Sequence, residues 1–163
     1  MDSGAAASAT HRERRKSYQL AGRQKFKEDL EFQRLCMLYW GEGTKSKGVI
    51  VFTNSDPDMM LDFYSLLFKC FSLKREDVTL RVNAYLNNGL SKEEIEGYWL
   101  NLLQIPTTQL RKGTFNSHSP SSKRLKRSLL YGTAAIVHCS TEHVQMIYGG
   151  ISSCCSTEFK FLF

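Results

Sequence analysis

The stretch LCMLYWGEGTK, residues 35–45, determines how the rest of the chain is interpreted. Its apolar part is too short to cross a membrane, which takes roughly 20 apolar residues. We expect a core helix that ends at Gly41 and Gly43, with Glu42 between them. A helix C-terminus carries partial negative charge, so stability does not explain an acid at this position. Glu42 is therefore either a functional carboxylate or an ordinary acid in a glycine turn.

Size and charge narrow the class of protein. The 163 residues fit one domain, and a hydrophobic content of 42% is enough for a core. The net charge is +6, and no acid occurs between Glu96 and Glu142. This excess favours an anionic partner, and nucleic acid and acidic lipid both qualify. With no membrane-spanning stretch and no apolar signal segment at the N-terminus, we expect an intracellular, cytoplasmic protein, or a nuclear one in a eukaryote.

The cysteines and tryptophans are expected to be structural. The five cysteines are odd in number and include no Cys-x-x-Cys pair, which favours buried reduced thiols over a disulfide framework or a zinc site. Trp40 and Trp99 are expected in the core rather than as stacking platforms for bases.

Apolar spacing predicts the order of helices and strands. Helices are expected at about 17–41, with an early part that frays or forms a separate helix, and at about 56–73, 91–105 and 140–148. Strands are expected at about 48–53, 78–85 and 132–139. Residues 1–16 are expected to be a disordered basic tail, 17–150 a single domain with a basic loop or irregular hairpin at 107–128, and 151–163 a C-terminal tail. The fold class is α+β, an antiparallel or mixed sheet with helices packed on one face.

Local capping signals mark the helix ends. Asp56 or Ser55 is expected to cap the second helix with Pro57 in its first turn, and Ser91 with Glu94 forms a capping box for the third. Gly149 and Gly150 are expected to stop the last helix.

Two segments are candidates for contact with nucleic acid. The strand at 78–85 alternates, and one face carries side chains that reach phosphates and base edges: Thr79, Arg81, Asn83 and Tyr85. The 107–128 segment carries a cluster of cations: Arg111, Lys112, Lys123, Arg124, Lys126 and Arg127. The alternatives are an exposed polar strand face and a solvated loop or localisation signal.

Residues 39–45 (YWGEGTK) and 52–57 (FTNSDP) give the chain a family resemblance. It resembles LAGLIDADG homing-endonuclease-like domains over about residues 30–150, in particular single-motif bacterial and phage relatives. In that family two motif helices pack side by side, the acid that ends each helix holds a divalent metal over the scissile phosphates, and a saddle of antiparallel strands grips the DNA. Met37 departs from the family pattern, which has a small glycine there, and Trp40 stands where an acid is usual.

The resemblance implies a site and a partner. Glu42 would be the catalytic metal ligand for Mg²⁺, and Lys45 would offset phosphate charge or polarise an attacking water, unless it is a solvated turn lysine. One motif supplies one acid, so cleavage requires a homodimer. The motif-helix positions Cys36, Met37, Trp40 and Gly41 would form its interface. Bulk at Met37 makes close helix pairing harder.

Three functions follow from these observations. The first choice is a domain that binds double-stranded DNA without cleaving it. The second is a Mg²⁺-dependent DNA endonuclease that acts as a homodimer through Glu42. The third is a protein-interaction module in which the basic segment is incidental.

Overall fold

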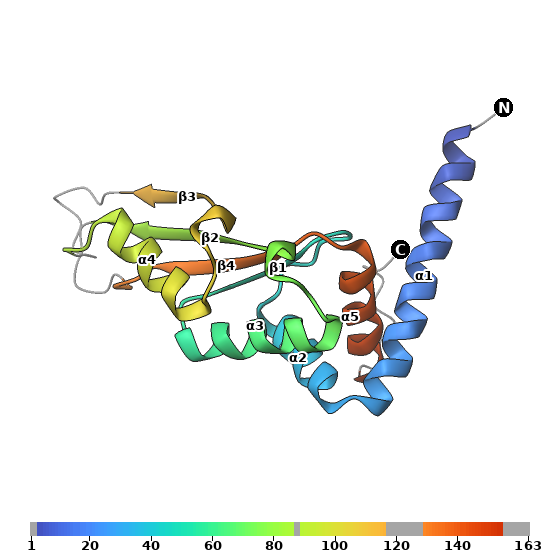
Figure 1. Cartoon of the computed structure of the whole chain (residues 1–163). Coiled ribbons are helices and arrows are strands. Elements are labelled where there is room, and N and C mark those ends of the chain that lie inside the picture. The colour runs from blue at the N-terminus through green and yellow to red at the C-terminus, as the bar shows by residue number, and fades with distance from the viewer. Residues whose placement is uncertain (1–2, 87–88, 117–128, 155–163) are drawn as a thin grey trace.

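A computed structural model describes residues 3–86, 89–116 and 129–154, with side chains described from residue 8 onward. This part of the chain contains five helices and four strands (Figure 1). The helices are α1 (Ser3–Glu28), α2 (Leu30–Glu42), α3 (Pro57–Phe71), α4 (Lys92–Leu103) and α5 (Thr141–Cys154), with short 3-10 turns at Arg75–Asp77 and Thr107–Gln109. The strands are β1 (Ile50–Asn54), β2 (Val78–Tyr85), β3 (Leu110–Asn116) and β4 (Thr133–His138).

The four strands form one mixed sheet in the order β1-β4-β2-β3. β4 pairs antiparallel with β1 and with β2, whereas β3 pairs parallel with β2 at one edge. α4 makes the crossover that a parallel pair needs. The expected class, α+β with a mixed sheet, is confirmed.

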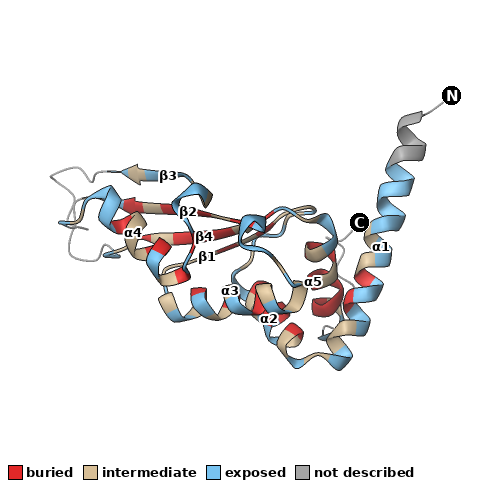
Figure 2. Ribbon diagram, in the orientation of Figure 1, coloured by how far each residue is buried: buried red, intermediate tan, exposed pale blue. Residues whose placement is uncertain are grey.

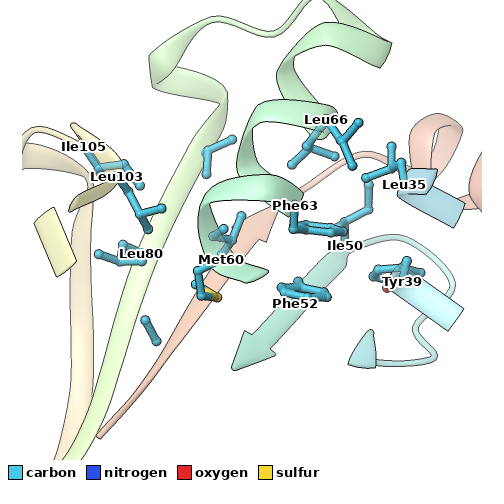
Figure 3. Close-up of a cluster of buried hydrophobic side chains, with 14 of the residues drawn as sticks. Leu35, Tyr39, Ile50, Phe52, Met60, Phe63, Leu66, Leu80, Leu103 and Ile105 are labelled. Carbon is cyan, nitrogen blue, oxygen red and sulfur yellow. The ribbon is translucent and has the colours of Figure 1, made fainter. Parts of the chain in front are cut away.

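Helices cover one face of the sheet, and the core lies between the two layers (Figures 1 and 2). Along β2 the burial alternates, so that Val78, Leu80, Val82 and Ala84 are buried as the sequence predicts. Figure 3 shows α3 packed on β1 through the rings of Phe63 and Phe52, whose centroids lie 3.9 Å apart with their planes nearly parallel.

The predicted helix starts of α3 and α4 are confirmed. The Asp56 carboxylate accepts hydrogen bonds from the first-turn N–H groups of α3, and Pro57 opens that helix. Ser91 and Glu94 make both halves of the capping box of α4. Asp29 caps α2 and separates it from α1, so the expected early segment is a helix of its own.

Two glycines hold α1 against α5. A Cβ at Gly22 would fall within 3.0 Å of the backbone of Met146, and one at Gly149 within 3.0 Å of the backbone of Gln19. The expectation that Gly149 and Gly150 stop the last helix is therefore wrong, since α5 continues through both to Cys154. Their missing side chains allow neighbouring elements to approach, with Gly150 against the Cys36 thiol.

Other expectations are also corrected. Residues 3–16 belong to α1 rather than to a disordered tail. Residues 110–116 form a strand that pairs in parallel with β2, where a basic loop or an irregular hairpin was expected. Trp99 is buried as expected, but Trp40 is 41% exposed on the outer side of α2. Of the cysteines that the structure describes, Cys36 is buried, Cys70 half-buried, and Cys139 and Cys154 exposed. The expectation of buried thiols is therefore not met by Cys139 and Cys154.

Candidate nucleic-acid interface

The face of the sheet away from the helices carries polar and basic side chains, together with the apolar Val51, Ala135 and Val137 of β1 and β4. On β2 it carries Thr79 and Asn83, half-buried, and Arg81 and Tyr85, exposed, as the alternation predicts. Strand register places further side chains on this open face: Thr53 of β1, Thr133 of β4, and Arg111, Thr114 and Asn116 of β3. None of these side chains on the open face is acidic.

Arg81 and Arg111 stand directly beside each other on this face. They are register partners in the parallel β2–β3 pair, and across the sheet the same row continues through Ala135 to Thr53. Like charges in neighbouring positions of a sheet destabilise it. The stability of the fold therefore does not account for two adjacent guanidinium groups here.

The charges of the helical layer contrast with this pair. On that side exposed cations form ion pairs, such as Arg34 with Asp62 at 2.8 Å and Lys69 with Glu31 at 2.9 Å. Within the described ranges no acid pairs with Arg81 or Arg111. Arg111 makes only a long hydrogen bond, 3.4 Å, to the carbonyl of Thr108. The open face thus carries positive charge that the described residues leave uncompensated.

A bulge between β2 and β3 shapes the middle of the face. The register shifts after Arg81, where a Cβ on Gly113 would collide with the carbonyl of Val82. The Oδ1 atom of Asn83 accepts a hydrogen bond from the N–H of Thr114 at 2.9 Å and fixes the strand beyond the bulge. Asn83 therefore makes a structural hydrogen bond as well as occupying the predicted position on the face.

The remaining basic candidates divide into two groups. Lys112 is exposed at the bulge on β3, at the edge of the sheet. Lys123, Arg124, Lys126 and Arg127 lie outside the described residues.

Glu42 is exposed at the last position of α2, beside the sheet. The next residue, Gly43, pairs with Phe52 of β1, and the Thr44 N–H donates to the carbonyl of Val51 at 2.9 Å. This pairing sets Glu42 at the β1 edge of the sheet, opposite the β3 edge that carries Arg111.

Lys45 caps the C-terminal end of α2. Its ammonium donates to the carbonyl oxygens of Tyr39 at 3.1 Å, Trp40 at 2.9 Å and Gly43 at 2.7 Å. Partial burial lowers the pKa of this ammonium. Its three N–H donors are all used on backbone oxygens, so the geometry favours capping over the catalytic role that the resemblance implied.

The outer face of α2 carries exposed apolar side chains. Leu30 is 72% exposed, Met37 37% and Trp40 41%, and a Cβ added at Gly41 would meet nothing within 4 Å. Cys36 does not belong to this face. It is fully buried, with its thiol 3.7 Å from the carbonyl of Ile147 in α5, and burial raises its pKa. The expectation that Cys36 lines a dimer interface is therefore wrong, whereas Met37, Trp40 and Gly41 are accessible.

Among the residues that the structure describes, no group of three or more His, Cys, Asp or Glu side chains could hold a metal ion. Glu42 is one carboxylate, and Mg²⁺ in proteins is bound by one or two carboxylates together with substrate phosphates and water.

The sequence did not reveal the β3 contribution to the open face. Thr114 and Asn116 lie in the segment for which the sequence predicts a basic loop or irregular hairpin. Their position on the open face depends on pairing with β2. Weak alternation of apolar Leu110 and Phe115 with polar residues is the only local signal, and the bulge interrupts it.

No model of a known protein family, no curated protein and no solved structure matches the chain. In the described part of the chain no helix is long and apolar enough to cross a membrane.

Proposed function

We propose that the protein binds double-stranded DNA through the open face of its sheet. The observation that carries this proposal is the adjacent pair Arg81 and Arg111, which no described acid compensates. A phosphate backbone supplies the missing negative charge and releases counterions when it binds. Threonine and asparagine side chains around the pair add hydrogen-bonding groups that contact phosphates or base edges.

A relation to the LAGLIDADG-like domains is part of the proposal. It is supported by a helix with one buried face that ends in an exposed acid at a sheet edge and by one sheet face left open. The parallel pairing of β2 with β3 differs from the antiparallel saddle of that family. We therefore propose binding, rather than cleavage, as the primary activity.

The test is a salt titration of duplex binding, measured by fluorescence anisotropy. One phosphate contact contributes about 0.9 to the slope of log K against log salt concentration, which is about eightfold in affinity at 0.1 M salt. Arg81→Gln should therefore weaken binding by about this factor and reduce the slope by about 1. The control is Lys69→Gln, which removes the same charge from the helical layer, where Lys69 pairs with Glu31.

Two results would contradict the proposal. One is duplex binding that does not change between low and high salt. The other is an Arg81→Gln variant that binds as tightly as the Lys69→Gln control. Either result would favour the protein-interaction module instead.

A second candidate is a Mg²⁺-dependent endonuclease that acts as a homodimer. It is favoured by the exposed apolar face of α2, which a second copy could cover, and by Glu42 at the end of the same helix. Only two copies could bring two Glu42 carboxylates to one site. A cleavage assay with Mg²⁺ tests this candidate: Glu42→Gln should abolish cutting while duplex affinity is retained, and an equally active variant would exclude it.

A further inference from the structure

A basic pocket lies away from the open face, where α1 meets the start of α5. The segment that leads into β1 supplies Lys47 and Gly48, and the first turn of α5 supplies Thr141 and Glu142. Because Ile50 pairs with His138, the start of β1 and the end of β4 lie side by side, and the pocket opens at this end of the sheet. Its volume is about 450 Å³, within the range of roughly 300–1,000 Å³ that small-molecule sites occupy.

Three cations line the pocket against one carboxylate. Arg14 and Arg15 come from α1 and Lys47 from the segment before β1, and Glu142 is the single acid. The guanidinium of Arg14 donates to the hydroxyl of Tyr18 at 3.3 Å, and this hydrogen bond, with a smaller electrostatic effect of Glu142, raises the pKa of Arg14. Among the described residues, Arg15 forms no ion pair with an acid.

Arg15 is the least satisfied of these groups. Its Nε atom is buried and has no hydrogen-bond partner among the residues that the structure describes. A buried donor without a partner destabilises the fold, and donors of this kind are normally satisfied. An oxyanion in the pocket would provide the acceptor.

Backbone donors of α5 face the same region. Thr141 and Glu142 occupy the first turn, where N–H groups have no carbonyl partner within the helix. The Ser140 hydroxyl accepts a hydrogen bond from the N–H of His143 at 3.2 Å. This bond does not involve the N–H groups of Thr141 and Glu142. The positive end of the helix dipole adds to the attraction of an anion.

Buried and half-buried hydrogen bonds join the three walls of the pocket. Gln19 of α1 donates to the side chain of Gln145 in α5 at 2.6 Å, and Gln145 donates in turn to the carbonyl of Lys47 at 3.0 Å. The Tyr148 hydroxyl donates to the carbonyl of Ser46 at 2.7 Å. The pocket is therefore built before any ligand enters, which reduces the entropic cost of binding.

We propose that this pocket binds a phosphate group carried on a larger molecule. A phosphate supplies several acceptor oxygens for guanidinium and helix N–H donors, and its negative charge is opposite to that of the cations that line the pocket. The volume leaves room for the sugar of a nucleotide. The same chemistry comes from a free nucleotide or from a backbone phosphate of DNA, and the second source rests on the proposed function.

The experiment titrates the ¹⁵N-labelled full chain with inorganic phosphate and with adenosine monophosphate at low salt. Saturable amide shifts are expected at residues 11–18, 47–48 and 141–142. Arg15→Gln should weaken the binding of both ligands at least tenfold. The matched control is Arg12→Gln, which removes the same charge one turn earlier on α1 from a side chain that does not line the pocket, and it should stay within twofold.

Duplex titrations of the same variants identify the source of the phosphate. If the site takes a backbone phosphate, Arg15→Gln also weakens duplex binding and lowers its salt slope by about 1. If the site takes a free phosphate ester, duplex binding is unchanged while nucleotide binding is weakened. Both outcomes support a phosphate site. Wild-type protein that binds no duplex but still binds phosphate would contradict only the proposed function.

Two results would overturn the inference: no saturable shift with either ligand, or equal affinity in Arg15→Gln and the Arg12→Gln control. Circular dichroism establishes that each variant is folded. Arg14→Gln serves as a second pocket variant, and it should weaken phosphate binding as well.

Discussion

Substituting Gly149 by alanine tests how α1 is attached to the rest of the molecule. A Cβ at this position would lie 2.7 Å from the Gln19 backbone Cα and carbonyl carbon and closer still to its carbonyl oxygen. The neighbouring atoms are helix backbone, which cannot rotate away as a flexible side chain can. The two helices must therefore separate for the methyl group to fit.

The size of the effect follows from two opposing contributions. Alanine gains about 1 kcal/mol over glycine in a helix interior. Overpacking a close contact costs about 1–3 kcal/mol, and occasionally more, and the upper part of this range applies where backbone meets backbone. We expect a net loss of about 2 kcal/mol in the free energy of unfolding, which lowers the urea midpoint by about 1 M when the m-value is about 2 kcal/mol/M.

The control is Gly97→Ala in α4, because nothing lies within 4 Å of a Cβ placed there. This variant should be more stable than the wild type by up to about 1 kcal/mol. Urea unfolding followed by circular dichroism measures both changes. If Gly149→Ala also proved more stable than the wild type, the close packing of α1 on α5 would be refuted.

Three further predictions concern the cap, the histidines and the α2 face. Lys45→Met should lower the free energy of unfolding, measured with urea, by about 1–2 kcal/mol, because three charge-assisted hydrogen bonds at a helix C-terminus are lost. The control Lys69→Met removes an exposed ion pair with Glu31 and should change the free energy of unfolding by less than about 1 kcal/mol. Burial, and then the neighbouring His138, lower the pKa of His143 below its ordinary value of 6.5, so the unfolded chain binds more protons than the folded chain. The free energy of unfolding should therefore fall as pH drops through 6.5 toward the folded-state pKa of His143. A His143→Gln variant whose free energy of unfolding depends on pH in the same way as that of the wild type would contradict this prediction. If copies pair through α2, Met37→Glu should give a monomer in analytical ultracentrifugation, and an unchanged sedimentation coefficient at equal concentration would exclude that interface.

Features with a local cause could be predicted from the sequence. Asp56 caps α3 and Ser91 caps α4 because each side chain bonds N–H groups two or three residues away. The alternation of β2 is likewise visible, since buried and exposed residues succeed one another along a single strand. These local signals predict the fold class and the side chains that β2 places on the open face.

Features created by distant neighbours could not be predicted. Gly149 and Gly150 have the local pattern of a helix stop, and only the position of α1 and α2 shows that they permit close packing. β3 is an edge strand that depends on its pairing with β2, and the basic pocket combines residues 14–15, 47 and 141–142. No short window of the sequence contains such a set.

Lys45 changes how Glu42 is to be interpreted. An acid at a helix C-terminus opposes the partial negative charge of the last carbonyl groups, and from the sequence alone this opposition argues for function. In the structure the Lys45 ammonium binds three of the carbonyl oxygens around that end and offsets much of this charge. The position of Glu42 is thus compatible with stability. Evidence for a nuclease must then come from its exposure at the sheet edge and from the apolar face of α2, and the Glu42→Gln and Met37→Glu variants test these two observations separately.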